Sequence, residues 1–144
     1  MYKTVRVLLA CLVLGLFACS CGKDDDEAPS VSTDRYYVRY EVGAKSIHYE
    51  DVQISVATDS GNQSYTVSLT PTNSTSYNWV DCHNIFSETF GPLQKGFETK
   101  VSASTTQGVP LVVSIHVCRN SEAFVLKANN SGITACSTSY QIDF

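Results

Sequence analysis

From residue 35 onward, apolar and polar side chains alternate with a period of two residues, and this feature constrains the fold more than any other. The segments 38–42, 52–56, 65–69 and 111–117 each place an apolar residue at every second position. Successive side chains of a β-strand point to opposite faces, so each segment would bury one face and leave the other in water. We find no helical period of 3.6 residues in this region. The pattern predicts an all-β domain.

Turn signals divide this region into short strands. Asp59-Ser60-Gly61-Asn62 suits a tight hairpin turn. We expect a second turn at 91–96, before a strand over 97–103, and a third at 129–132, before a last strand ending near Phe144. Tyr77 and Trp79 mark a further short strand. Seven to nine strands of this kind predict a two-sheet antiparallel sandwich, with a small β-barrel as the alternative.

The N-terminal segment has the form of a signal peptide. Residues 1–6 are short and positively charged, and the mostly apolar run 7–18 follows. Twelve helical residues rise only about 18 Å, whereas the hydrocarbon core of a bilayer is roughly 30 Å thick. We therefore expect residues 1–20 to be removed as a leader rather than to span the membrane.

Two cysteines at the end of this run are candidates for lipid attachment. The stretch from Leu16 to Asp26 resembles the lipobox recognised by the lipoprotein signal peptidase. Cys19 follows Ala18, as the usual pattern requires, but Cys21 is followed by Gly-Lys-Asp-Asp. That tetrapeptide looks like the export signal of surface lipoproteins in Bacteroides-like bacteria, and it favours Cys21 over Cys19. Several acyl chains, each contributing ~0.8 kcal/mol per buried methylene, would hold the protein at the outer membrane, exposed at the cell surface.

The remaining chain divides into a stalk and a domain. Residues 21–33 are acidic and almost without large apolar side chains, which is typical of a disordered linker, and residues 34–144 form the sandwich domain. The chain of 144 residues has a formal net charge of −4, and the domain's basic residues are scattered singly between Arg35 and Lys127. A nucleic-acid surface needs clustered Lys and Arg, so we expect no nucleic acid partner.

Three segments carry a resemblance across most of the domain: Tyr36–Val42, Phe90–Phe97 and Ser139–Phe144. They resemble small surface lipoproteins of Bacteroides-like bacteria. The domain is similar, more weakly, to the periplasmic domain of accessory proteins of mycobacterial lipid exporters. That second resemblance implies an immunoglobulin-like sandwich and a transport-accessory role. Those relatives are held by a transmembrane helix instead of lipid, so no binding residues are carried over.

The domain has three cysteines, Cys82, Cys118 and Cys136, which allow at most one internal disulfide with one thiol left over. We favour Cys118 with Cys136, because the loop they close is of moderate length and they lie on successive terminal strands. Such a bridge would contribute roughly 3 kcal/mol. The alternative is that all three are small buried residues.

No motif predicts catalysis or a cofactor. In Asp81-Cys82-His83, neighbouring side chains of an extended chain diverge, so the thiol and the imidazole would not share a proton. His48, His83 and His116 lack the spacing of a zinc site. We expect no enzyme activity, no metal and no cofactor.

Exposed aromatic side chains are the remaining candidates for a binding surface. The candidates that face a ligand are Tyr36, Tyr37 and Tyr77, with Tyr49 and Trp79 beside them. Aromatic faces stack on sugar rings and anchor protein partners, although aromatic residues also favour strands for packing reasons alone. The sequence thus predicts a non-catalytic binding or assembly module, anchored to the membrane by lipid, that engages a glycan or an envelope protein. The alternatives are a structural or transport-accessory lipoprotein and, third, an enzyme.

Overall fold

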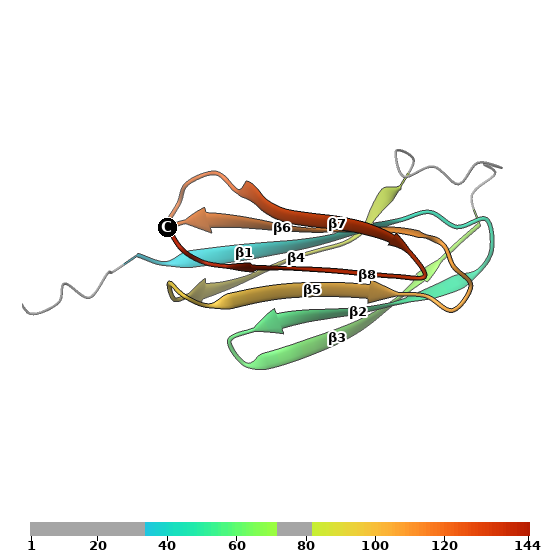
Figure 1. Cartoon of the computed structure of the whole chain (residues 1–144), viewed down its shortest axis with the longest axis horizontal. Coiled ribbons are helices and arrows are strands. Elements are labelled where there is room, and N and C mark those ends of the chain that lie inside the picture. Colours follow the sequence, from blue (N-terminus) through green and yellow to red (C-terminus); the bar gives the residue numbers. More distant parts are fainter. Residues whose placement is uncertain (1–33, 72–81) are drawn as a thin grey trace, which may run out of the picture. The chain divides into compact units, whose positions relative to one another are not determined.

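The computed structural model describes residues 34–71 and 82–144, which form two antiparallel sheets of four strands each (Figure 1). The strands are β1 (Tyr36–Ala44), β2 (Glu50–Thr58), β3 (Gly61–Leu69), β4 (His83–Leu93), β5 (Glu98–Ser104), β6 (Pro110–Arg119), β7 (Val125–Ile133) and β8 (Ala135–Gln141). The first sheet has the order β4-β1-β6-β7 and the second has the order β3-β2-β5-β8. The predicted all-β sandwich is confirmed, with eight strands in the described residues.

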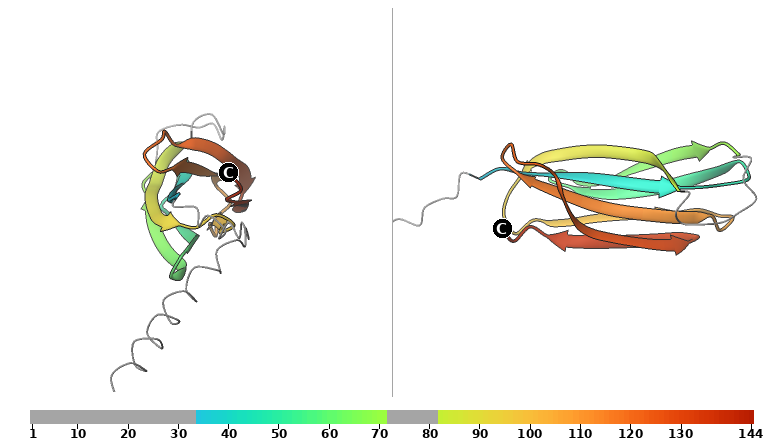
Figure 2. Two further views of the ribbon diagram at one scale, coloured as in Figure 1. Left: turned by 90° about the vertical axis from the view of Figure 1, so that its left-hand side faces the viewer. Right: turned by 90° about the horizontal axis from the view of Figure 1, so that it is seen from above.

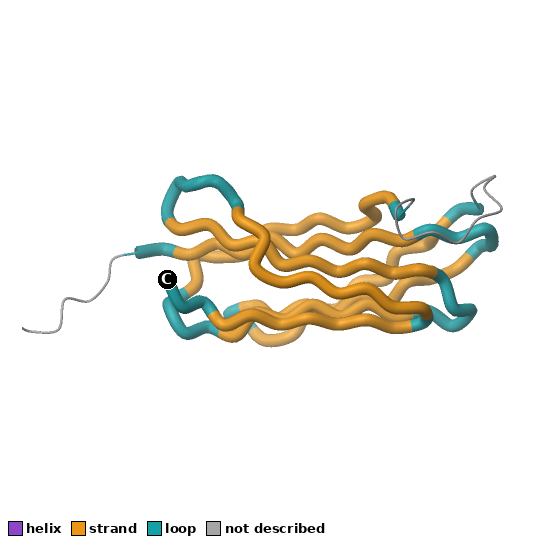
Figure 3. The backbone as a smooth tube through the Cα atoms, turned by 45° about the horizontal axis from the view of Figure 1, so that its top comes forward, coloured by secondary structure: helices purple, strands orange, loops and turns teal. Residues whose placement is uncertain are grey.

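The core lies between the two sheets, because each central strand turns one face inward. Along β1 and β2, buried residues occupy every second position, as the alternation of the sequence predicts. Figure 3 shows how strands account for most of the described chain. The inward-facing side chains of the four central strands include Val38, Tyr40, Val42, Ile54, Val56, Val101, Val113, Ile115 and Val117.

The best predicted strands are the central ones. β1 and β6 pair without interruption from Tyr36 opposite Arg119 to Ala44 opposite Leu111. The hairpin between β2 and β3 closes where Thr58 lies opposite Gly61, and Gly61 has a φ of 108°. Only glycine adopts that φ without strain, so the predicted turn is confirmed together with its chemical reason.

Two edge strands differ from the sequence prediction. β4 (His83–Leu93) was not predicted as one strand. It includes the first part of segment 91–96, which was expected to be a turn, and it contains the cis Gly91-Pro92 bond. Residues 129–132, expected to be a turn, lie within β7, and the chain reverses at Thr134, which has a φ of 73°. Both strands are largely exposed, so packing imposes little periodicity on their sequence.

The end of the domain is joined to its beginning. The ring of Phe144 lies edge-on to that of Tyr36, with centroids 5.6 Å apart, and the Tyr36 hydroxyl donates to the Phe144 carbonyl. Beside them, Arg119 Nη2 lies 2.6 Å from Asp34 Oδ2. Figures 1 and 2 show the C-terminus next to the start of β1. These contacts tie the first described residues to the last.

Several expectations concern residues that the structure does not describe. The leader, both lipidation candidates (Cys19 and Cys21), the stalk, Tyr77 and Trp79 lie outside the described residues. Within 34–71 and 82–144, no helix has the length and apolar character required to cross a membrane.

Candidate functional site

An open hollow of about 550 Å³ lies on the outer face of the second sheet, where β2 begins and β3 ends. Its walls come from three segments: residues 49–53, residues 68–69, and residues 104–107 at the end of β5 and in the loop after it. Its volume is within the range of roughly 300–1,000 Å³ that small-molecule sites occupy. We take this hollow as the candidate binding site.

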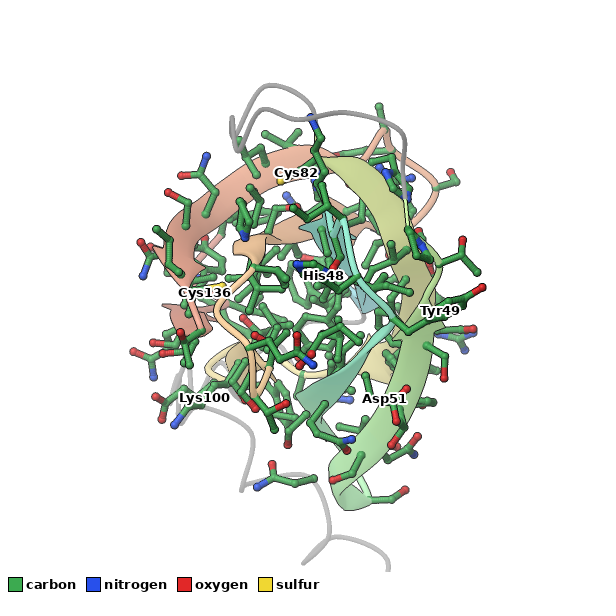
Figure 4. All side chains as sticks on the ribbon, turned by 90° about the vertical axis from the view of Figure 1, so that its right-hand side faces the viewer. His48, Tyr49, Asp51, Cys82, Lys100 and Cys136 are labelled. Carbon is green, nitrogen blue, oxygen red and sulfur yellow. The ribbon has the colours of Figure 1, made fainter. Side chains whose placement is uncertain are left out.

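Three exposed side chains of different chemistry lie at alternate positions at the start of β2. Tyr49 directly precedes the strand, Asp51 and Gln53 belong to it, and the residues between them, Glu50 and Val52, are buried. Tyr49 is 77 % exposed, the highest value among the exposed large hydrophobic residues within 34–71 and 82–144. Figure 4 shows Tyr49 and Asp51 on the same side of this end of the sandwich.

Hydrogen bonds from β3 orient two of these side chains, Asp51 and Gln53. Ser68 donates to Asp51 Oδ1 over 2.6 Å, and Thr66 donates to Gln53 Oε1 over 2.9 Å. Both pairs lie directly opposite each other in the register of β2 and β3. The carboxylate and the amide therefore reach the hollow in defined positions.

Glu50 fixes the loop that forms the other wall. Its side chain is buried, and Oε1 accepts hydrogen bonds from the Thr106 amide (2.7 Å), the Thr106 hydroxyl (3.0 Å) and the Gln107 amide (3.2 Å). Burial by itself would raise the pKa of this carboxyl, but the bonds from Thr106 and Gln107 outweigh it and lower the pKa. An ionised Glu50 thus holds the loop against β2.

The predicted ligand-facing aromatics have different positions in the structure. Tyr36 is only 2 % exposed and packs in the core, so its assignment to a binding surface is wrong. Tyr36, Val38 and Tyr40 are alternate residues of β1, and all three side chains point toward the core. Tyr37 is half-buried on the outer face of the other sheet, against Gly91, and does not line the hollow.

Sequence reasoning named Tyr49 but missed the polar residues around it. The alternation of β2 predicts that Asp51 and Gln53 face solvent, and it is the one feature of the sequence that points to them. Nothing local indicated that Ser68 and Thr106 would join them, because those residues arrive through strand pairing and the packing of a loop.

The favoured disulfide is also wrong. Cys118 and Cys136 are both free thiols. Cys118 follows the inward-facing Val117 and so lies on the outer side of the first sheet, whereas Cys136 belongs to the core cluster. Burial raises the pKa of both thiols, and for Cys136, helped by nearby Cys82, the pKa reaches about 11. Both thiols are therefore protonated and poorly reactive at neutral pH.

The outer face of the first sheet carries a charge cluster with a structural role. One carboxylate oxygen of Glu41 lies 2.9 Å from Arg39 Nε, and the other lies 3.2 Å from His116 Nε2. The Arg39 guanidinium lies 4.7 Å from the centre of the Phe124 ring. His116 is on the outer face. The charges of Arg39 and Glu41 are thus paired within the protein.

The hollow combines one exposed aromatic ring with carboxylates, amides and hydroxyls, and its described lining residues include no cysteine or histidine. Across 34–71 and 82–144, no three His, Cys, Asp or Glu side chains are grouped so as to hold a metal ion. No family model, no curated protein and no solved structure matches the chain.

Proposed function

We propose that the protein is a non-catalytic binding module, held by lipid at Cys21 on the outer membrane and exposed at the cell surface. The observation that carries the binding role is Tyr49, an aromatic ring 77 % exposed beside a polar hollow. Aromatic side chains are enriched where proteins bind partners, because the ring supplies a large flat contact surface and the tyrosine hydroxyl a polar one.

The anchor rests on the sequence around Cys21. In cells grown with labelled palmitate, we expect Cys21→Ala to lose the label and Cys19→Ala to keep it. Label retained in Cys21→Ala and lost in Cys19→Ala would move the anchor to Cys19. Loss of the protein to protease added outside intact cells tests its exposure at the surface.

The binding role is tested with the mature lipoprotein held by its acyl chains on a lipid-coated sensor. Clarified cell-envelope extract from the source organism is passed over the wild type and Tyr49→Ala. We expect binding that Tyr49→Ala removes. Ile133→Ala is the matched control, because Ile133 is a large apolar residue, 63 % exposed, that does not line the hollow. Equal binding by wild type and Tyr49→Ala would exclude the hollow as the binding site.

One observation favours a second candidate, an assembly role beside an envelope complex. Among the described strands, β3 pairs only with β2, and its nine residues include no charge, no proline and no register shift. Natural edge strands commonly carry such features to prevent pairing with another chain. A photo-crosslinker at Gln63 on β3 should capture one envelope protein. The same group at the exposed Thr89 on β4, an edge strand that does carry a charge, a proline and register shifts, should not. No crosslink at Gln63 would exclude this candidate.

A further inference from the structure

We infer that the hollow binds a neutral glycan, with one sugar ring stacked on Tyr49 and its hydroxyls bound by Asp51 and Gln53. The inference rests on the proposed binding function and specifies the class of ligand. Three properties of the hollow support a neutral glycan: the arrangement of side chains at the start of β2, the hydrogen-bonding capacity of the walls, and their charge.

The first step is that Tyr49 and Asp51 match the two kinds of surface that a sugar ring presents. Tyr49 directly precedes β2 and Asp51 is the second residue of β2, and both exposed side chains line the hollow. One face of a pyranose ring is lined by C–H groups and packs on an aromatic face, while its edge carries hydroxyls. Tyr49 provides the aromatic face, and the Asp51 carboxylate accepts hydrogen bonds from hydroxyls.

The second step is the hydrogen-bonding capacity of the walls. A sugar hydroxyl both donates and accepts. A carboxylate such as Asp51 only accepts, whereas the amides of Gln53 and Gln107 do both. Ser104 adds a hydroxyl that can rotate to either role, and the Thr106 hydroxyl, which donates to Glu50, can still accept. Ser68 and Thr66 already hold Asp51 and Gln53 in place, so little side-chain entropy is lost on binding.

The third step is charge, which separates neutral from acidic glycans. Glu50 and Asp51 both line the hollow, and no lysine or arginine is among its described lining residues. The lowered pKa of Glu50 keeps that carboxyl ionised at neutral pH. A uronate, sulfate or phosphate group would meet two negative charges without a cation to balance it.

A peptide ligand fits less well. Protein recognition concentrates its energy in apolar or aromatic anchors that enter desolvated pockets. Apart from Tyr49, the only large apolar side chain among the described residues that line the hollow is Leu69, which is buried at the end of β3. The walls thus offer many polar groups and a single apolar platform, which matches a sugar ring better than a side-chain anchor.

The test uses the full mature lipoprotein on the lipid-coated sensor with defined polymers. The neutral probes are mannan, xylan, glycogen and mixed-linkage β-glucan, and the acidic probes are polygalacturonate and hyaluronan. We expect at least one neutral polymer to bind more tightly than either acidic one. Tyr49→Ala and Asp51→Asn should each weaken that binding about tenfold or more, which corresponds to roughly 1.4 kcal/mol. Tyr49→Phe keeps the aromatic face on which the sugar ring stacks, so this variant should still bind the neutral polymer.

Two controls match these variants. Glu98→Gln removes an exposed carboxylate from the same outer face, outside the hollow, and Ile133→Ala removes an exposed apolar side chain. Neither should change binding. If a neutral polymer binds but Tyr49→Ala does not weaken it, the site is wrong.

Envelope extract separates failure of this inference from failure of the proposed function. Periodate cleaves the vicinal diols of sugar rings, and proteinase K removes proteins. Binding that depends on Tyr49 and disappears after periodate supports the inference even if every defined polymer fails. Binding that depends on Tyr49 but survives periodate, or a preference for acidic polymers, overturns the inference and leaves the binding function standing. No Tyr49-dependent binding to any probe overturns both.

Discussion

The hydroxyl of Tyr40 links the two sheets at a point where a strand ladder stops. β2 and β5 pair from Gln53 opposite Ser104 to Val56 opposite Val101, and the next pair in that register would be Ala57 and Lys100. There the buried Tyr40 hydroxyl donates to the Ala57 carbonyl over 2.6 Å and also hydrogen-bonds with the Lys100 backbone. Burial raises the pKa of Tyr40 to about 12, although the Lys100 bond lowers it in part.

We expect Tyr40→Phe to destabilise the domain by about 1–3 kcal/mol, because it leaves buried backbone groups of Ala57 and Lys100 without a partner. Urea unfolding monitored by circular dichroism measures this loss. Tyr65→Phe is the control, since the Tyr65 hydroxyl bonds only to the exposed Gln63 side chain and its removal should cost little. Equal stability of wild type and Tyr40→Phe would show that water or a rearranged ladder replaces the hydroxyl.

The thiols lead to a second prediction for single residues. With a pKa of about 11, Cys136 is thiolate in only about one molecule in a thousand at pH 8. This thiol should therefore react slowly with Ellman's reagent in native Cys82→Ser, a variant that removes the half-buried Cys82 thiol. In urea, the same protein should react at once. A reducing agent should leave Tm unchanged, whereas loss of a bridge would lower it by roughly 10 °C or more. A Tm that falls on reduction would contradict the free thiols.

At the scale of residues, the sequence predicts which face of a sheet a side chain lies on better than it predicts what that side chain does. The phase of alternation is the same for Tyr36, Val38 and Tyr40, so the burial of Tyr36 could have been read from its neighbours. Its aromatic chemistry suggested a binding surface instead. Aromatic side chains serve cores and surfaces equally well, and only the phase distinguishes the two uses.

At the scale of elements, predictability depends on whether alternate side chains of a strand pack on the core. The edge strand β3 is largely exposed, but Tyr65, Val67 and Leu69 pack on the core and their alternation is visible in the sequence. Both neighbours of β6 are strands and one of its faces is in the core, so nearly every position is constrained and the alternation is clear. β4 and β7 are edges with mostly exposed side chains. The Asn and Ser residues of β7, taken as a turn, are tolerated there because they face solvent. Asn130, for example, donates to the Ser137 carbonyl of β8.

The loop between β5 and β6 should depend on the ionisation of Glu50. Because the pKa of Glu50 is lower in the folded domain, its contribution to stability is complete above the unfolded value of about 4.3. It is lost as the pH falls through the folded value. We expect Glu50→Gln to have a lower Tm than wild type at pH 7, with the difference shrinking below about pH 4.

Thermal unfolding between pH 3 and pH 7 checks this dependence. Glu98→Gln serves as the control, because Glu98 is exposed and none of the loop's hydrogen bonds involves it. A difference between wild type and Glu50→Gln that is the same at pH 3 and pH 7 would mean that the carboxyl acts through its shape and not its charge.

At the scale of the whole domain, the candidate site arises from pairing and loop packing rather than from any local motif. Tyr49 and Asp51 come from the start of β2 and the residue before it, but Ser68 arrives through the register of β3 and Thr106 through a loop more than fifty residues later. A period-two pattern identifies strands and faces. It contains no information on which strands become neighbours, so the hollow could not be predicted from it.

The last residue of the domain contributes to closing the sandwich. Phe144 packs edge-on against Tyr36, accepts its hydroxyl through the backbone carbonyl, and lies under the Lys127 ammonium, 3.8 Å from the ring centre. One side chain thus contacts the first strand and the edge strand β7. We expect Phe144→Ala to destabilise the domain by about 1–3 kcal/mol, less than a fully buried phenylalanine, because the ring is only partly buried.

Gln141→Ala, at an exposed position of β8, should have almost no effect. Urea unfolding compares the two variants, and hydrogen exchange of the amides at the start of β1 shows where stability is lost. Because the contact joins the two ends of the domain, exchange should accelerate around Tyr36 and Tyr37 and not at the Tyr49 hollow, which lies where β2 begins. Acceleration at the hollow instead would mean that the terminal contact supports the whole sandwich as one cooperative unit, and binding at Tyr49 would then depend on Phe144.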